Sequence, residues 1–77
     1  MTLEKLPVGK EGVISVVGGS GALRHRLLDM GLIPGTTVAV RKIAPLGDPI
    51  EIRLRGYELT IRREDAAMIE LKEGAAL

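Results

Sequence analysis

The segment 50–61 constrains the fold of this chain most, because its apolar residues alternate on both sides of an Arg55-Gly56 dipeptide. If this dipeptide forms a two-residue turn, the segment folds back on itself as an antiparallel hairpin. The resulting pairs are apolar on one face, Leu54 with Tyr57, Ile52 with Leu59 and Ile50 with Ile61, and polar on the other, Arg53 with Glu58 and Glu51 with Thr60. Because a shift of one residue would destroy both patterns, the sequence predicts this register. Arginine is less favourable than asparagine or aspartate at the first turn position, so a longer loop is the alternative.

Three further strands are predicted around this hairpin. Residues 13–17 are rich in β-branched side chains, residues 36–43 alternate between apolar and mixed positions, and residues 68–71 form a last apolar run. Residues 44–49 contain two prolines and predict a protruding loop with Leu46 near its tip. The later connections are too short for parallel crossovers. We therefore expect a mainly β fold, a small antiparallel barrel of about five strands, whose closure would remove exposed strand edges.

One short helix is predicted near residues 20–30. Ser20 is a candidate N-cap, and Leu23, Leu27 and Met30 recur at helical spacing. Gly31 then fits the left-handed position that commonly ends a helix, and Pro34-Gly35 suits the centre of a type II turn. Residues 64–67 begin with two acids and predict a single helical turn.

The composition limits the chain to one small domain with an aliphatic interior. Its 77 residues include one aromatic side chain and no cysteine, so disulfides and thiolate metal sites are excluded. We expect a single domain over residues 1–77, with an ordered core from about residue 6 to residue 72 and a frayed tail at 73–77. The sequence has neither a signal-like apolar segment nor a membrane-spanning run, which favours a cytosolic location.

The reactive side chains do not suggest catalysis. His25 is the only imidazole, and with Asp29 four residues later it is a weak candidate metal site; we favour an exposed, weakly interacting pair. We find no nucleophilic constellation, so an enzyme is not expected. The basic residues of the predicted sheet are interleaved with acids and the chain has almost no aromatic stacking platforms, which argues against nucleic acid as a partner. These basic residues are Arg41, Lys42, Arg53, Arg55, Arg62 and Arg63.

Three motifs resemble those of the ferrous-iron transport protein A (FeoA) family. They are residues 27–35 (LLDMGLIPG), residues 47–50 (GDPI) and residues 57–62 (YELTIR), followed by Ala66 and Ile69, in the family's order and spacing. The resemblance covers about residues 6–71. It implies an SH3-like barrel with an inserted helix, and a cytosolic accessory protein of bacterial ferrous-iron uptake. The implied partner is the membrane permease FeoB, which carries a cytosolic GTP-binding domain. No cofactor is expected beyond a transient ferrous ion, and the membrane is reached only through the partner.

The motif glycines, the Pro34-Gly35 turn and the apolar residues Leu27, Ile50 and Ile61 are expected to be architectural, so contacts with a partner must come from other side chains. We predict a surface of three leucines with two arginines at its rim, for a protein partner or for self-association: Leu28, Leu32, Leu46, Arg24 and Arg26. The alternative is that the leucines only cap the barrel. The second function left open is a metal-responsive sensor module, akin to the SH3-like domains of metal-dependent transcriptional repressors.

Overall fold

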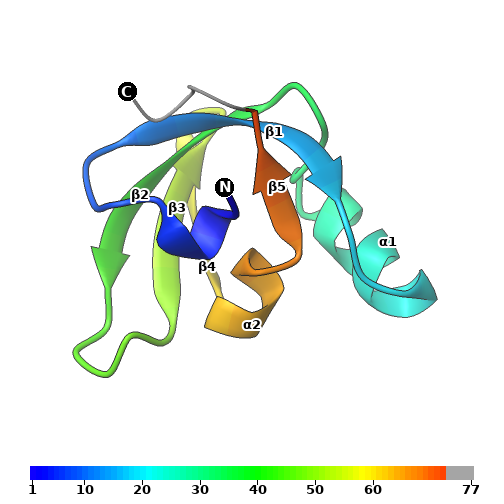
Figure 1. Ribbon diagram of the computed structural model, residues 1–77. Coiled ribbons are helices and arrows are strands. Elements are labelled where there is room, and N and C mark those ends of the chain that lie inside the picture. Colours follow the sequence, from blue (N-terminus) through cyan, green and yellow to red (C-terminus); the bar gives the residue numbers. More distant parts are fainter. Residues whose placement is uncertain (73–77) are drawn as a thin grey trace.

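The computed structural model describes residues 1–72, so the tail expected at residues 73–77 lies outside the described residues. Figure 1 shows the elements in chain order. They are the 3₁₀ helix η1 (Leu3–Lys5), β1 (Glu11–Val17), α1 (Gly21–Asp29), β2 (Thr37–Ile43), β3 (Ile50–Leu54), β4 (Tyr57–Ile61), α2 (Arg63–Ala66) and β5 (Ile69–Leu71). The predicted strands, helix and helical turn are all confirmed, with bounds that differ by at most two residues.

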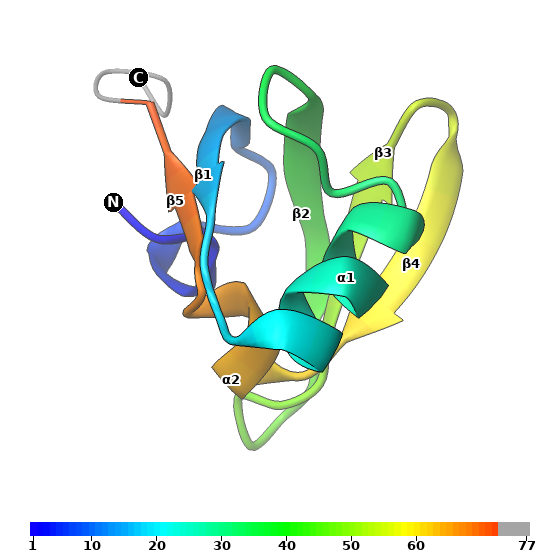
Figure 2. The same cartoon turned by 90° about the vertical axis from the view of Figure 1, so that its right-hand side faces the viewer.

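The five strands form one antiparallel sheet in the order β4-β3-β2-β1-β5. The sheet is strongly curved, its end strands β5 and β4 lie on opposite sides of the view in Figure 2, and α2 connects them (Figures 1 and 2). The barrel is thus closed partly by a helical turn and not by a β4–β5 ladder within the described residues. We expected closure of the barrel to remove the exposed strand edges. This expectation is wrong, because β4 and β5 do not pair with each other.

The hairpin register predicted from the sequence is confirmed at all five pairs. Arg55 and Gly56 both have positive φ, 49° and 83°, as a two-residue hairpin turn requires. Tyr57 is nevertheless exposed and Leu59 half-buried, because β4 is an end strand of the sheet. A shared face therefore does not guarantee equal burial at the edge of the sheet.

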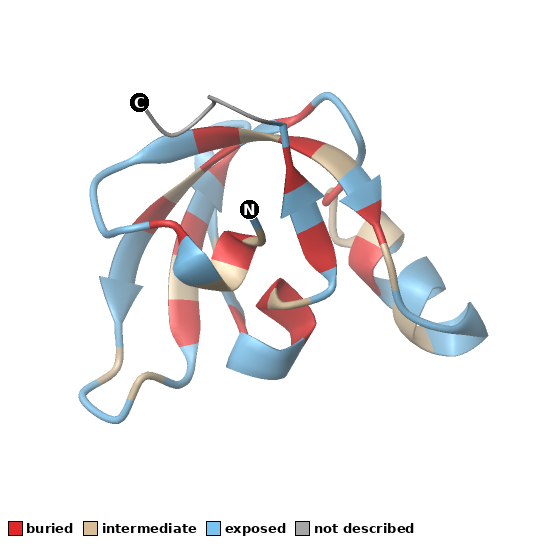
Figure 3. Cartoon of the chain, viewed as in Figure 1, coloured by how far each residue is buried: buried red, intermediate tan, exposed pale blue. Residues whose placement is uncertain are grey.

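The core is aliphatic, as the composition requires, and buried positions alternate with exposed ones along the strands (Figure 3). Leu27, Ile50 and Ile61 belong to it, which confirms their expected role. The buried apolar residues are Leu3, Leu6, Ile14, Val17, Leu27, Leu32, Val38, Val40, Ile50, Ile52, Leu54, Ile61, Ala66, Ile69 and Leu71.

The core begins nearer the N-terminus than we predicted. Leu3 is fully buried, so an ordered core starting at residue 6 is too short. The physical reason is that the first residues pair with β5 and cover its outer edge. Thr2 and Glu70 form a bridge, and the Leu71 amide donates a hydrogen bond of 2.8 Å to the Met1 carbonyl. Pairing of this kind satisfies backbone groups that an end strand would otherwise leave without partners.

The C-terminal end of α1 is a Schellman motif. The Gly31 amide donates to the Leu28 carbonyl at 3.0 Å, and the Leu32 amide donates to the Leu27 carbonyl at 3.1 Å. Gly31 has the left-handed φ of 97° that the sequence predicts for it. At the other end Ser20 has the extended backbone of an N-cap, but its side chain makes no capping hydrogen bond.

Candidate functional site

The two arginines of the predicted partner surface are both engaged within the chain. The Arg24 Nε donates a hydrogen bond of 3.1 Å to the Val17 carbonyl, at the end of β1. The Arg26 Nη2 lies 3.6 Å from Oδ2 of Asp65, a buried residue of α2. These contacts attach α1 to its neighbours, so the arginines position the helix.

Leu32 is buried, which corrects its assignment to the partner surface. It directly follows Gly31 in the Schellman motif, and an apolar residue at that position commonly packs back onto the helix. Leu28 is half-buried and packs against the core. Of the two side chains, only Leu28 has any exposed surface to offer a partner, so the alternative that the leucines cap the barrel holds for Leu32.

Leu46 is 94% exposed, but it lies apart from the helix. Figure 1 shows the loop between β2 and β3 on the opposite side of the molecule from α1. The five residues of the predicted surface are therefore not brought together. Two of them bind neighbouring elements, one is buried, and Leu46 belongs to a separate surface.

The loop that carries Leu46 adjoins a hollow with a mixed lining, in which Lys42, Glu51 and Thr60 accompany apolar residues. This hollow, of about 320 Å³, lies at the base of the loop, and its apolar lining includes Ile43, Pro45 and Pro49. Ile43 is itself 40% exposed. We call these three residues and Leu46 the loop face. Ile43 was not among the predicted contact residues, although its place at the end of an alternating strand, next to a proline-rich loop, was an available signal.

Hydrogen bonds brace the loop that carries Leu46. The Ala44 amide donates to the Pro49 carbonyl at 3.0 Å, and the Gly47 amide donates to the Ala44 carbonyl at 2.7 Å. The carboxylate of Asp48 accepts a hydrogen bond of 2.9 Å from the Arg63 amide, at the start of α2. The loop face is thus preorganised, which lowers the entropy lost when a partner binds.

The candidate metal site consists of two exposed side chains on α1. His25 and Asp29 lie one helical turn apart, and within residues 1–72 no three potential metal-binding side chains cluster together. Two exposed donors do not form the closed coordination shell of a structural metal site. Within the same residues, no helix has the length and apolarity needed to cross a membrane.

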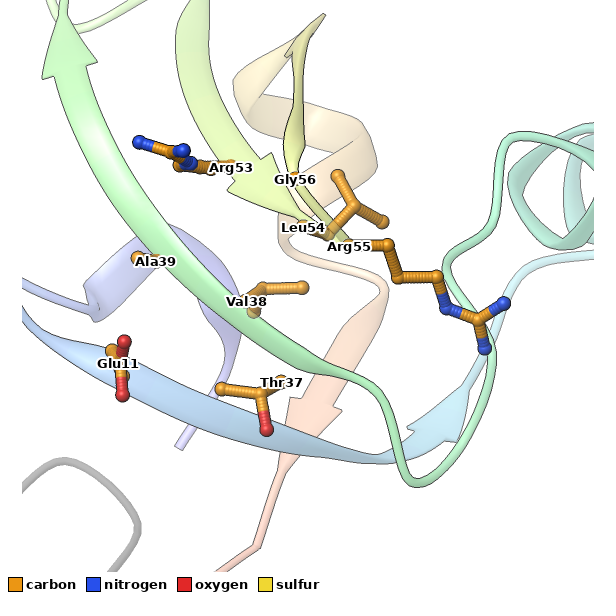
Figure 4. Close-up of a pocket in the computed structure, with 8 residues that line it drawn as sticks. All are labelled: Glu11, Thr37, Val38, Ala39, Arg53, Leu54, Arg55 and Gly56. Carbon is orange, nitrogen blue, oxygen red and sulfur yellow. The ribbon is translucent and has the colours of Figure 1, made fainter.

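A second hollow, of about 250 Å³, lies over the outer face of β1, β2 and β3 (Figure 4). Its charged lining comes from Glu11 on β1 and from Arg53 and Arg55 at the end of β3 and in the following turn. From the sequence, these arginines were interpreted only as basic residues interleaved with acids. The hollow itself is not visible in the sequence, because it depends on which residues of three strands become neighbours.

Comparison with known proteins identifies relatives over nearly the whole chain. The model of the FeoA domain family matches residues 1–73. An Fe(2+) transport protein A/Fe(2+) transporter FeoB fusion protein of Porphyromonas gingivalis is 44% identical over 72 residues. These residues are 94% of this chain but span only 8% of the fusion protein's length.

Solved structures give the same result for the fold. The FeoA protein of Chlorobium tepidum is 38% identical, with a TM-score of 0.85 over 100% of this chain and 78% of its own. The zinc-complexed FeoA of Stenotrophomonas maltophilia, described as a procaryotic SH3 domain protein, is 24% identical, with a TM-score of 0.83 over 97% of this chain and 93% of its own. The IdeR protein of T. acidophilum shares the fold over 92% of this chain and 32% of its own, at 21% identity and a TM-score of 0.80.

The likenesses below 25% identity establish the SH3-like fold alone. The family model and the relatives at higher identity go further, since they match the sequence itself over at least nine tenths of its length. On this evidence the chain belongs to the FeoA domain family.

Proposed function

We propose that this chain is a cytosolic accessory protein of bacterial ferrous-iron uptake, and that it acts by binding an FeoB-type permease. The observation that carries the proposal is the Porphyromonas gingivalis fusion protein, in which a segment 44% identical to this chain shares a polypeptide with an FeoB transporter. A covalent link raises the effective concentration of one domain at the other to about the millimolar range. At such a concentration, even a weak contact between the two domains would form.

The loop face is the surface that we assign to this contact. Leu46 is almost fully exposed on a braced loop, beside a hollow lined by Ile43 and two prolines. Burying apolar surface against a partner contributes about 25 cal/mol per Å². The proposal places the contact on the cytosolic GTP-binding domain that the family resemblance implies for the permease.

The second function, a sensor module for a metal-dependent repressor, has weaker support. The likeness to a manganese-dependent transcriptional repressor is one of fold alone, at 12% identity. His25 and Asp29 are the only pair of neighbouring donors that the sequence analysis singled out, and both are exposed. Regulation of a permease through a protein contact is therefore the function that we favour.

A co-purification experiment tests the proposal. The chain is mixed with the permease's GTP-binding domain and with the full permease in detergent, each loaded with GDP or with a non-hydrolysable GTP analogue, with and without ferrous ion. We expect retention of the chain by at least one nucleotide state. No retention in any state by either form of the permease would refute the proposal.

Two matched variants test the loop face. Leu46→Lys is expected to weaken retention about tenfold, because a charge would be buried against the partner. Val16→Lys changes a side chain that is 55% exposed on β1 and should bind as the original chain does. Equal retention of both variants would show that the contact does not involve the loop face. Loss of a concentration-dependent dimer in Leu46→Lys, with permease binding intact, would assign the loop face to a second copy instead.

A further inference from the structure

The two end strands of the sheet differ in how their outer edges are satisfied. The first residues of the chain cover β5, through the bridge between Thr2 and Glu70 and the hydrogen bond from the Leu71 amide to the Met1 carbonyl. β4 lies on the opposite side of the view in Figure 2, and within residues 1–72 it pairs only with β3. A free strand edge is a ready site for pairing with another strand.

The hairpin turn determines which backbone groups of β4 point away from β3. A two-residue turn makes its flanking residues, Leu54 and Tyr57, a hydrogen-bonded pair. Hydrogen-bonded and non-hydrogen-bonded pairs alternate along antiparallel strands, so Glu58 and Thr60 form pairs of the second kind with β3. The amides and carbonyls of Glu58 and Thr60 therefore point outward. Within residues 1–72 they have no hydrogen-bond partner.

Arg62 continues this outer edge beyond the end of β4. Its backbone is extended, with a φ of −73° and a ψ of 150°. Its carbonyl accepts hydrogen bonds from the amides of Asp65 and Ala66 in α2, but its amide donates to no backbone carbonyl within residues 1–72. The side chains of Glu58, Thr60 and Arg62 are all exposed, and they alternate along one face. We call these three residues the β4 edge.

We propose that the β4 edge pairs with the β4 edge of a second copy of this chain, antiparallel and about a two-fold axis at Thr60. In this register Glu58 of each copy lies opposite Arg62 of the other, and the two Thr60 residues lie opposite each other. Opposite charges and threonine pairs are favourable cross-strand neighbours. On the other face Leu59 lies opposite Ile61, so an apolar residue meets an apolar residue. The sequence of the β4 edge is thus complementary to itself, as a two-fold interface requires.

The other two-fold registers are less favourable. An axis between two residues would place an outward-pointing residue opposite an inward-pointing one, and such residues cannot exchange hydrogen bonds. An axis at Glu58 or at Arg62 places like charges directly opposite each other, which is destabilising. An axis at Leu59 places Arg62 opposite Gly56, so the arginine has no carboxylate directly across from it.

The ion pairs within each copy leave these charges available. Arg62 pairs with Glu64, but their side chains are 74% and 73% exposed, and pairs this exposed contribute little. Glu58 lies 3.4 Å from Arg41. A carboxylate has two acceptor oxygens, so Glu58 can bind Arg41 of its own chain and Arg62 of the second copy together. This contact uses neither the loop face nor the permease.

Sedimentation of the purified chain at concentrations from about 10 µM to about 1 mM tests the proposal. We expect a reversible equilibrium between monomer and dimer, and a weak one, because pairing along one short strand buries little surface. Glu58→Arg and Arg62→Glu should each lower the dimer association constant about tenfold, since each places like charges opposite each other. The double variant should return to within about twofold of the original chain, because the opposite charges are restored in exchanged positions.

Leu46→Lys is the control for the loop face and should dimerise as the original chain does. Circular dichroism checks that every variant folds. Because retention by the permease is measured separately, failure of the dimer and failure of the permease contact are distinguishable.

A cysteine placed at the proposed axis tests the register. The chain has no cysteine, so Thr60→Cys introduces a single thiol. Opposite residues of a hydrogen-bonded pair have Cα atoms about 5.5 Å apart, within the range that a disulfide spans. We expect Thr60→Cys to form a cross-linked dimer under mild oxidation. Glu58→Cys should not, because four residues of extended chain, about 13 Å, separate its two copies in this register.

Four outcomes would overturn the proposal. The first is a chain that stays monomeric up to about 1 mM. The second is a double charge variant that dimerises no better than the single variants. The third is equal cross-linking of the two cysteine variants. The fourth is loss of the dimer in Leu46→Lys, which would assign self-association to the loop face.

Discussion

At the scale of single residues, Gly31 satisfies two requirements at once. Its φ of 97° ends α1, and a Cβ atom at this position would lie 2.8 Å from the hydroxyl oxygen of Tyr57. That hydroxyl donates a hydrogen bond to the Met30 carbonyl, so it ties the first residue of β4 to the end of α1. Glycine is therefore needed here for its backbone and for its lack of a side chain.

Gly35 provides a control that separates these two requirements. It has a similar φ of 93°, but a Cβ atom there would meet nothing within 4 Å. Gly31→Ala is expected to lower the free energy of unfolding by about 1–3 kcal/mol, and Gly35→Ala by about 1 kcal/mol. Urea denaturation measures both values. Equal losses would show that only the backbone angle matters, and Tyr57→Phe should reduce the loss at Gly31 by removing the hydroxyl.

At the scale of elements, α1 is held both by apolar packing and by the polar contacts of two arginines. Leu27 is the only buried residue within its bounds. The helix is attached to β1 by the hydrogen bond from Arg24, and to α2 by the ion pair between Arg26 and Asp65. Asp65 is buried and Arg26 is its ion partner. Loss of this pair would therefore leave a buried carboxylate without a nearby positive charge.

Arg26→Glu is therefore expected to lower the free energy of unfolding by about 1–3 kcal/mol, since it places a second carboxylate next to Asp65. Arg62→Glu is the matched control. Its partner, Glu64, is exposed, and exposed pairs contribute about 1 kcal/mol or less. Urea denaturation gives the stabilities, and hydrogen exchange in α1 should rise selectively in Arg26→Glu. A control variant as unstable as Arg26→Glu would contradict this account.

Local sequence patterns were enough to predict the helices and strands. Burial and the grouping of surface residues depend on contacts between distant segments, and these could not be predicted. The hairpin register followed from alternation within twelve residues, and Gly31 from the rules for helix ends. The burial of Leu3 and the separation of Leu46 from α1 depend on the order of all five strands, which alternation does not specify. The hollow over β1, β2 and β3 was not predicted for the same reason, because Glu11 and Arg53 are brought together only by their shared neighbour Ala39 on β2.

At the scale of the whole molecule, the N-terminal segment is a structural part of the barrel. Leu3 and Leu6 are buried against the core, and Arg63 of α2 lies 3.5 Å from Glu4. Small domains have about 5–15 kcal/mol of net stability, so no single large core residue is dispensable. The first residues should therefore matter as much as the central strands.

Leu3→Ala is expected to lower the free energy of unfolding by about 2–5 kcal/mol, as Ile52→Ala should in the middle of the sheet. Val8→Ala changes an exposed side chain of the same segment and should cost less than about 0.5 kcal/mol. Thermal and urea denaturation of the three variants gives the comparison. A Leu3 variant as stable as the Val8 variant would mean that the N-terminal segment is dispensable.

The bridge between Thr2 and Glu70 has a consequence for how this domain can be joined to others. Because these residues are neighbours, the chain enters and leaves the described part, residues 1–72, at nearly the same place. Gene fusion in either order would then allow the appended protein a similar reach, and linker length would govern their encounter more than domain order.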